Sequence, residues 1–295
     1  MTMSVSAIAI RSMSVMSDLH SILFSPEWSF LRFAMLVGLC LSPAIGVIGT
    51  MVVTRRISSL AGASTHAALG GFGLALFLQR VCMLEWFTPT LGAVAGAVTA
   101  AVAVGIVSIY AKEREDTVIG AVWAIGMSIG LLFLDRTPGY VDWQGYLFGS
   151  ILLLTAKDLT LTLILDAVIL IPAIIFFPAI LALTFDDTFA RLRGIKVTVL
   201  YLGLLVLTAL TIVLLINLVG IMLVIALLTL PSAAAACFTS HLRSTMILSA
   251  VFNAVFISLG LLLSSCFALP SGPAIVVLSG IVYAVSMIIK KYFLK

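Results

Sequence analysis

Long apolar segments, separated by short polar ones, make up almost the whole sequence. Most are close to the ~20 residues that an α-helix needs to cross the ~30 Å hydrocarbon core of a bilayer. They lie at about 30–53, 64–80, 89–111, 117–134, 158–184, 197–216, 218–238, 244–264 and 271–289. The pattern predicts an all-α, polytopic membrane helix bundle with eight or nine transmembrane helices.

The number of spans is open at one stretch. Residues 141–154 are apolar but short, and Gln144 and two glycines interrupt them, as expected of a re-entrant or partial helix. The start of the chain lacks the basic, apolar and small-residue regions of a signal peptide. We therefore expect an N-terminal arm over residues 1–29 and a transmembrane domain over residues 30–295.

Composition agrees with this picture and narrows the classes of function. Hydrophobic residues make up 62% of the chain, against roughly 45–50% in soluble domains. So few residues lie outside the spans that a large catalytic domain would have to belong to another chain. The net charge of +4 comes from Lys and Arg in short loops, which indicates topology determinants and no nucleic-acid partner.

The basic residues predict the orientation of the chain. They occur at Arg55 and Arg56, Lys112 and Arg114, Arg191, Arg193 and Lys196, Arg243, and Lys290 and Lys291. If spans alternate between these loops, all of them face one side, which the positive-inside rule makes the cytoplasm. Nine spans place the N-terminus outside, whereas eight place it inside.

One compact polar segment stands between two apolar stretches, at residues 185–196. Asp186 and Asp187 come first, Arg191 and Arg193 follow, and Gly194 stands where a helix would end. Acidic residues favour a helix N-terminus, basic residues favour the last turn, and glycine favours the position after it. We predict a short helix outside the bilayer that is suited to docking a soluble partner.

The sequence contains no GxxxxGK[ST] phosphate loop, no HExxH and no GxSxG motif. The chain is therefore not expected to be an enzyme or to bind ATP by a P-loop.

The remaining candidates for chemistry are polar residues within spans. His66, near the start of a span rich in small residues, is a possible ligand of a divalent cation, or else a histidine hydrogen-bonded between helices. Thr65 is placed to supply an oxygen contact or to satisfy the helix start. Asp166 lies inside a span, where a charge is costly unless it faces water or a partner.

Several segments, taken in order, resemble a known family. They are Arg55–Arg56 with the small-residue segment around His66, Arg114–Gly120, Thr137–Tyr140 with Tyr146–Gly149, Phe185–Ile195, and Leu228–Ala234. Over residues 30–290 the chain is similar to permease subunits of the ATP-binding-cassette (ABC) transporters that import zinc, manganese or iron. The resemblance implies a type II ABC importer-like permease of the bacterial cytoplasmic (inner) membrane, embedded in lipid.

The resemblance also implies roles and partners. Residues 185–195 match the coupling helix, in which Asp186, Asp187, Phe189, Ala190, Arg191 and Gly194 would transmit motion from separate ATPase subunits. The expected partners are those ATPases, a metal-binding solute-binding protein, and a second permease chain, identical or related. The metal would be transported cargo, with no stably bound cofactor, and the ATPase would use the ATP.

One position departs from the family. Many relatives carry an Asp four residues before the histidine that matches His66, whereas this chain has Gly62. A two-ligand site on one helical face is therefore absent. Two rival functions stay open at this point: an ABC permease for an organic or chelated solute, and an ion-driven secondary transporter.

Overall fold

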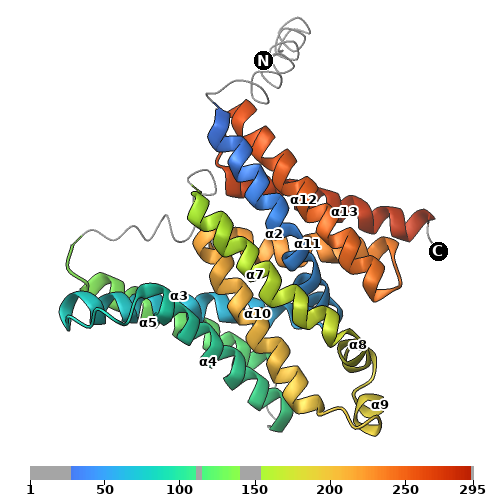
Figure 1. The fold of residues 1–295 in the computed structure, drawn as a ribbon, viewed down its shortest axis with the longest axis horizontal. Helices are drawn as coiled ribbons and strands as arrows, with labels where there is room; N and C mark the ends of the chain where they lie inside the picture. Colours follow the sequence, from blue (N-terminus) through green and yellow to red (C-terminus); the bar gives the residue numbers. More distant parts are fainter. Residues whose placement is uncertain (1–27, 111–114, 140–153, 294–295) are drawn as a thin grey trace, which may run out of the picture.

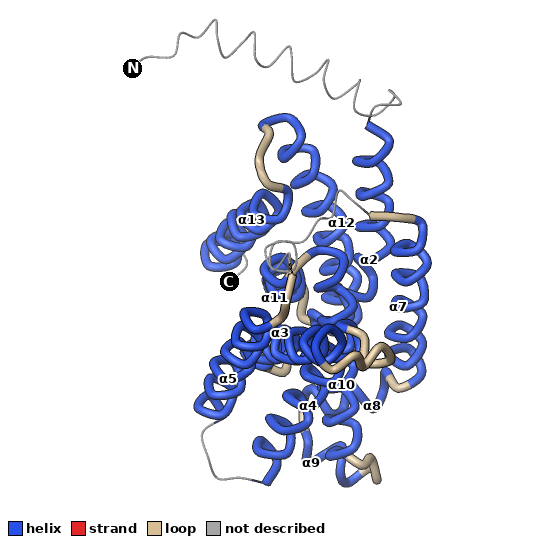
Figure 2. The backbone as a smooth tube through the Cα atoms, turned by 90° about the vertical axis from the view of Figure 1, so that its left-hand side faces the viewer, coloured by secondary structure: helices blue, strands red, loops and turns tan. Residues whose placement is uncertain are grey.

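The computed structural model describes residues 28–110, 115–139 and 154–293, and every regular element in these ranges is helical (Figures 1 and 2). The elements are α2 (Ser29–Thr54), α3 (Ser58–Val81), α4 (Pro89–Tyr110), α5 (Glu115–Arg136), α7 (Ala156–Ile175), α8 (Phe177–Phe185), α9 (Asp187–Leu192), α10 (Val197–Val219), α11 (Ile221–Phe238), α12 (Leu242–Phe267) and α13 (Ser271–Phe293).

Within the described ranges, nine helices are long and apolar enough to cross a membrane. The all-α membrane bundle is thus confirmed, with the higher of the two expected span counts. The expected N-terminal arm falls outside the described residues except for its last two, since α2 begins at Ser29. The possible re-entrant stretch at 141–154 also lies outside them, apart from its final residue.

Two predicted boundaries were wrong. The span expected at 158–184 is broken at Phe176, because Pro178 has no N–H to donate to the preceding turn and therefore begins a new helix, α8. The span expected from residue 64 begins earlier, at Ser58. His66 consequently lies inside α3, in its third turn, and not near its start.

The helices pack in two groups joined by α10. In one group α3 packs against both α4 and α5, and in the other α2 packs against α11 and α12, with α13 on α11. In Figure 1 the first group lies to the lower left and the second to the upper right. Helix α10 packs on α4, and α7 lies along α2.

Glycines set the close approach within the first group. A methyl group at Gly71 would overlap the carbonyl of Gly92 on α4, and one at Gly70 would lie 2.6 Å from the carbonyl oxygen of Gly126 on α5. Larger residues would push these backbones apart, because small residues are what allow membrane helices to touch.

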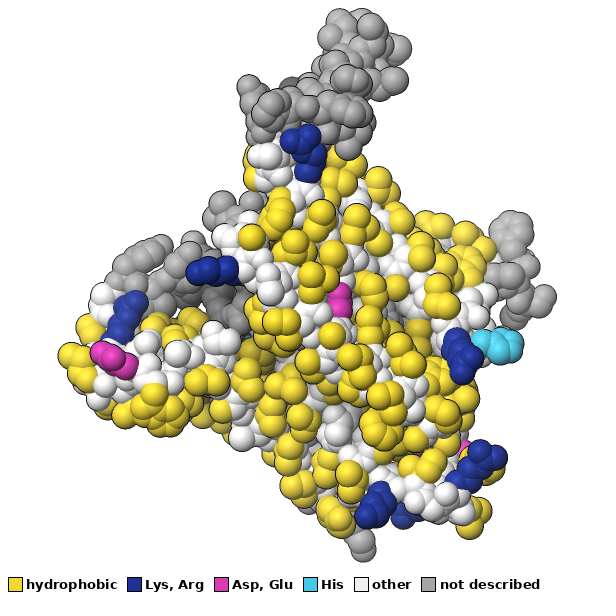
Figure 3. Space-filling model, viewed as in Figure 1, with side chains coloured by type: hydrophobic (Ala, Val, Ile, Leu, Met, Phe, Trp, Pro, Cys, Tyr) yellow, Lys and Arg dark blue, Asp and Glu magenta, His cyan; other side chains and the backbone are white. Residues whose placement is uncertain are grey.

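Basic side chains tie several loops together at one end of the bundle. Arg55, just after α2, pairs with Asp187 of α9, and Arg243 of α12 lies 4.6 Å over the ring of Phe177 on α8. Lys290 of α13 donates to the backbone of Ala236 near the end of α11. The face in Figure 3 is mainly hydrophobic, with basic side chains toward its edges, as expected of a surface in lipid.

Candidate functional site: the polar helix α9 and the His66 segment

Helix α9 begins at a capping carboxylate. Asp186 has extended backbone angles, and its Oδ1 accepts from the backbone N–H groups of Thr188 at 2.8 Å and Phe189 at 3.1 Å. These two donors hold the pKa of Asp186 below its ordinary value. The cap satisfies N–H groups that a six-residue helix would otherwise leave to water.

The other end of α9 closes in a Schellman motif. Ile195 N–H donates to the carbonyl of Ala190 at 3.1 Å, and Gly194 N–H donates to that of Arg191 at 2.9 Å. Gly194 takes a φ of 77°, in the left-handed region where only glycine avoids a clash of its own Cβ. The sequence signals at both ends of the predicted helix are therefore explained by local hydrogen bonds.

The two faces of α9 differ. Ala190 is fully buried, while Asp187 and Arg191, three residues before it and one after, line a polar pocket toward the bundle. The opposite face carries Phe189 and Leu192, which are 44% and 83% exposed. They are three residues apart, which makes them neighbours along one side of α9, and they form an apolar ridge away from the bundle. Phe185, the last residue of α8, is 66% exposed and precedes the extended cap residue Asp186.

Arg55 holds the inner face of α9 against the transmembrane helices. Its Nη1 donates to Asp187 Oδ1 at 2.9 Å and to the backbone carbonyl of Leu183, and its guanidinium lies 5.3 Å from the ring centroid of Tyr201 on α10. One side chain therefore connects α2, α8, α9 and α10. These contacts link α9 to two long helices, α2 and α10, and to the nine-residue helix α8.

A polar pocket of about 430 Å³ surrounds this contact. Its lining residues are Arg55, Arg56, Ile57, Ser108, Ile109, Asp187, Arg191, Val197, Thr198 and Tyr201. The end of α2, the last turn of α4 and the first turn of α10 all meet here, so α9 rests on the ends of three spans. Arg56 has a φ of 58°, and its place after α2 matches that of Gly194 after α9.

His66 is stacked on an aromatic ring. The ring centroids of His66 and of Trp123 on α5 are 4.6 Å apart, with 20° between the ring planes. Nδ1 is buried and has no hydrogen-bond partner among the described residues. A methyl group at Gly62 would lie 3.0 Å from Cζ3 of Trp123. The absence of a side chain at Gly62 thus leaves the space in which this chain packs the indole.

The other two predicted pathway residues lie elsewhere. Thr65 is fully buried, and its hydroxyl donates to the carbonyl of Ala61, one turn back in α3. Asp166 on α7 is 9% exposed and lies at the backbone of Ala44 on α2, with Cys40 nearby. Since α7 packs on α2 and His66 packs on α5, the structure does not bring Asp166 and His66 together.

Among the described residues, no three His, Cys, Asp or Glu side chains gather as a metal site. Arg55, Trp123 and Leu192 belong to the two candidate sites but were not predicted from the sequence as site residues. Two of them had features in the sequence that could have indicated a site: Arg55 lies in a basic loop, and Leu192 is an apolar residue in a polar helix. Trp123 had no such feature, because its partner His66 is far away along the chain.

Comparisons with known proteins agree on one family. Residues 27–290 match the sequence model of the ABC 3 transport family. A probable metal transport system membrane protein of Chlamydia pneumoniae is 38% identical over 88% of both chains, and a manganese transport system membrane protein of Listeria monocytogenes is 28% identical over 89% of this chain and 91% of its own. The solved structure of PsaBC from Streptococcus pneumoniae in complex with Fab is 25% identical, with a TM-score of 0.80, covering 94% of this chain and 98% of that one.

Proposed function

Because the chain belongs to the ABC 3 transport family, whose members are membrane permease subunits of metal transporters, we propose that it imports a divalent metal ion with energy from separate ATPase subunits. The basic loops at one end of the bundle favour that end as the cytoplasmic side. The similarity to bacterial membrane proteins favours the cytoplasmic membrane of a bacterium. The family assignment favours ATPase-powered transport over an ion-driven secondary transporter.

The observation that carries this proposal is the division of α9 into two faces. The exposed ridge of Phe189 and Leu192 suits an apolar groove on the ATPase, while Asp187 on the inner face is held by Arg55. ATP binding would then shift the population of inward and outward states through this contact. A metal-binding protein would supply the cargo on the opposite side, and a second permease chain would complete the pathway.

Along the pathway we propose His66 as a transient metal ligand, with Thr65 and Asp166 as further pathway residues. The unpartnered Nδ1 of His66 supports this role, since imidazole nitrogen is a common ligand of zinc and iron. With Gly62 in place of an acidic partner, the site would hold metal weakly, which suits an ion that must leave as readily as it enters.

Substitution of Leu192 tests the ATPase contact. In proteoliposomes with the ATPase and the metal-binding protein, Leu192→Asp should abolish copurification of the ATPase and ATP-driven metal uptake. Ser240→Asp is the matched control, because it adds the same charge at an exposed loop position on the same side. Full uptake by Leu192→Asp would remove α9 as the docking element.

A further inference from the structure

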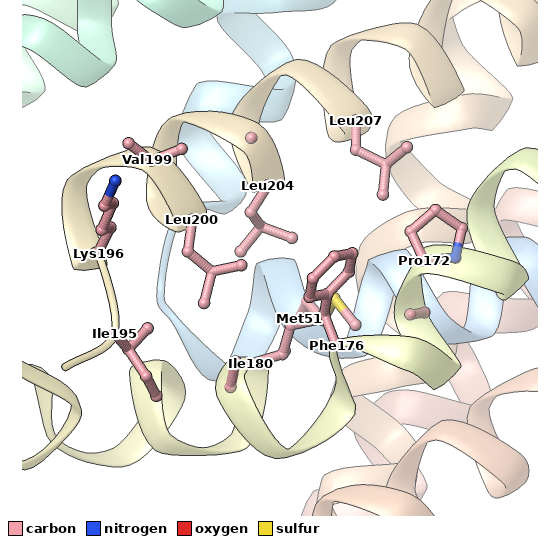
Figure 4. Close-up of a pocket in the computed structure, with 13 residues that line it drawn as sticks. Met51, Pro172, Phe176, Ile180, Ile195, Lys196, Val199, Leu200, Leu204 and Leu207 are labelled. Atoms are coloured by element: carbon pink, nitrogen blue, oxygen red, sulfur yellow. The ribbon is translucent and has the colours of Figure 1, made fainter. Parts of the chain in front are cut away.

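An apolar groove of about 440 Å³ runs between the α7–α8 break and the first half of α10 (Figure 4). It is lined by Met51, Pro172, Ala173, Phe176, Ala179, Ile180, Ile195, Lys196, Val199, Leu200, Gly203, Leu204 and Leu207. Lys196 is the only residue in this set with a charged side chain. Figure 4 shows Lys196 at one end of the groove and Pro172 at the other.

Two local features keep the groove open. The helix break at Phe176 turns α8 out of line with α7, so neither helix covers this side of α10 over its full length. Gly203 adds no side chain, and a Cβ built there would meet no atom within 4 Å. The space is therefore a consequence of the backbone and of one glycine, and the groove lies within a single chain.

The length of the groove along α10 is close to the thickness of one bilayer leaflet. Lys196 caps the start of α10, directly after the extramembranous helix α9, and Leu207 lies near the middle of that span. The eleven-residue rise between them is roughly 16 Å, about half of the ~30 Å hydrocarbon core. Within the groove, the positive charge of Lys196 lies at the membrane surface, and apolar side chains line the rest.

We propose that this groove is a binding site for a phospholipid with an anionic headgroup. One acyl chain lies along Leu200, Leu204 and Phe176, and the headgroup phosphate lies at the ammonium of Lys196. The charge pattern carries the choice of occupant, because an anionic lipid of that leaflet has its charge at one end, at the same depth as Lys196. A groove of this volume also falls in the ~300–1,000 Å³ range of ligand sites.

The bound lipid contacts the elements on both sides of α9. Phe176 and Ile180 lead into α9 through α8, and Ile195 and Val199 follow it. A lipid in the groove braces the two connections of the predicted coupling helix. The site itself does not rest on the proposed function, since lipid binding is measured without metal or ATP.

The test is lipid retention by the full-length chain in nanodiscs that hold equal amounts of phosphatidylglycerol and phosphatidylcholine with identical acyl chains. Native mass spectrometry of the released protein should show roughly a fivefold preference for phosphatidylglycerol, the effect of one lysine near the headgroups. Gly203→Leu fills the groove and should lose the retained lipid. Lys196→Gln should retain both lipids without preference.

Gly280→Leu is the matched control, because Gly280 also lies in a transmembrane helix with no atom within 4 Å of a built Cβ. It should behave as the unchanged protein. Equal retention of the two headgroups by the unchanged protein would overturn the lipid site, as would undiminished retention by Gly203→Leu. Dissociation of a permease dimer by Gly203→Leu would assign the groove to a second copy instead.

Discussion

Trp123 of α5 stacks on His66 of α3, with ring centroids 4.6 Å apart. Gly62, one turn before His66, leaves the room that the indole occupies. The stack fixes the plane of the imidazole and covers one side of it. Under the role proposed for His66, Trp123 would orient the ligand, and its loss should resemble the loss of His66.

Substitution of Trp123 tests this coupling. Trp123→Ala and His66→Ala should each lower metal uptake roughly tenfold, the usual cost of losing a residue that orients a ligand. The double variant should be no worse than either single one, because both remove the same arrangement. Trp123→Phe keeps a stacked ring and should retain most activity. Additive losses in uptake rate would show that the two residues act separately.

Substitution of Gly62 tests whether an acidic residue at position 62 would bind metal together with His66. Gly62→Asp and Gly62→Ala both place a Cβ 3.0 Å from the indole and should disturb the stack equally. Only the carboxylate restores a two-ligand pair with His66, and oxygen ligands favour manganese. We expect Gly62→Asp alone to raise manganese uptake relative to zinc. The same ratio in both variants would contradict this role for position 62.

The Arg55–Asp187 pair should matter more for coupling than for stability. Asp187 is 48% exposed, so the ion pair is worth at most ~1 kcal/mol to the fold. Asp187→Asn should therefore leave the protein folded but lower metal uptake per ATP hydrolysed, by roughly fivefold. Arg55→Lys should be similarly impaired, because Lys cannot contact Leu183, Asp187 and Tyr201 together.

The matching measurement is ATP hydrolysis and metal uptake in the same proteoliposomes. The double variant Arg55→Lys, Asp187→Asn should equal the single ones. Unchanged uptake per ATP in all three would exclude the pair from transmission.

Gly194 is required for its backbone angle and not for space. Its φ of 77° costs other residues ~1–2 kcal/mol, and no atom lies within 4 Å of a built Cβ. Gly194→Ala should lower the stability of the α9 turn, while Gly194→Asn should be milder. Gly280→Ala, in open space within a helix, should be neutral or stabilising. Hydrogen exchange of residues 187–195 measures the difference, and equal protection in all variants would contradict it.

The Asp186 cap should make α9 insensitive to pH in the working range. The folded-state pKa lies below the ordinary ~3.9, so the stabilising effect is complete above the unfolded value. It is lost as pH falls through the lower, folded pKa. Hydrogen exchange in α9, corrected for its intrinsic rate, should be constant from about pH 5 upward. Asp186→Asn keeps an acceptor and should behave like the parent, whereas Asp186→Ala should fray the helix at every pH.

The sequence by itself determined the spans and the ends of α9. Hydrophobic windows locate membrane helices because the bilayer imposes a length, and a cap is made within a few residues of itself, as at Asp186 and Gly194. The break at Phe176 was missed because a continuous apolar window does not reveal that it contains two helices, α7 of 20 residues and α8 of nine.

Only the tertiary structure decided which face each helix turns toward its neighbours and which side chains contact that face. Arg55 reaches Asp187 across 132 residues, and Trp123 covers His66 from another helix. Asp166 shares a polar, intramembrane character with His66 but faces α2 instead. No local pattern records such pairings, because they depend on the rotation of each helix about its axis and on its neighbour in the bundle. In a chain this apolar, that rotation is set by close backbone contacts such as Gly71 with Gly92, which hydrophobicity alone does not distinguish.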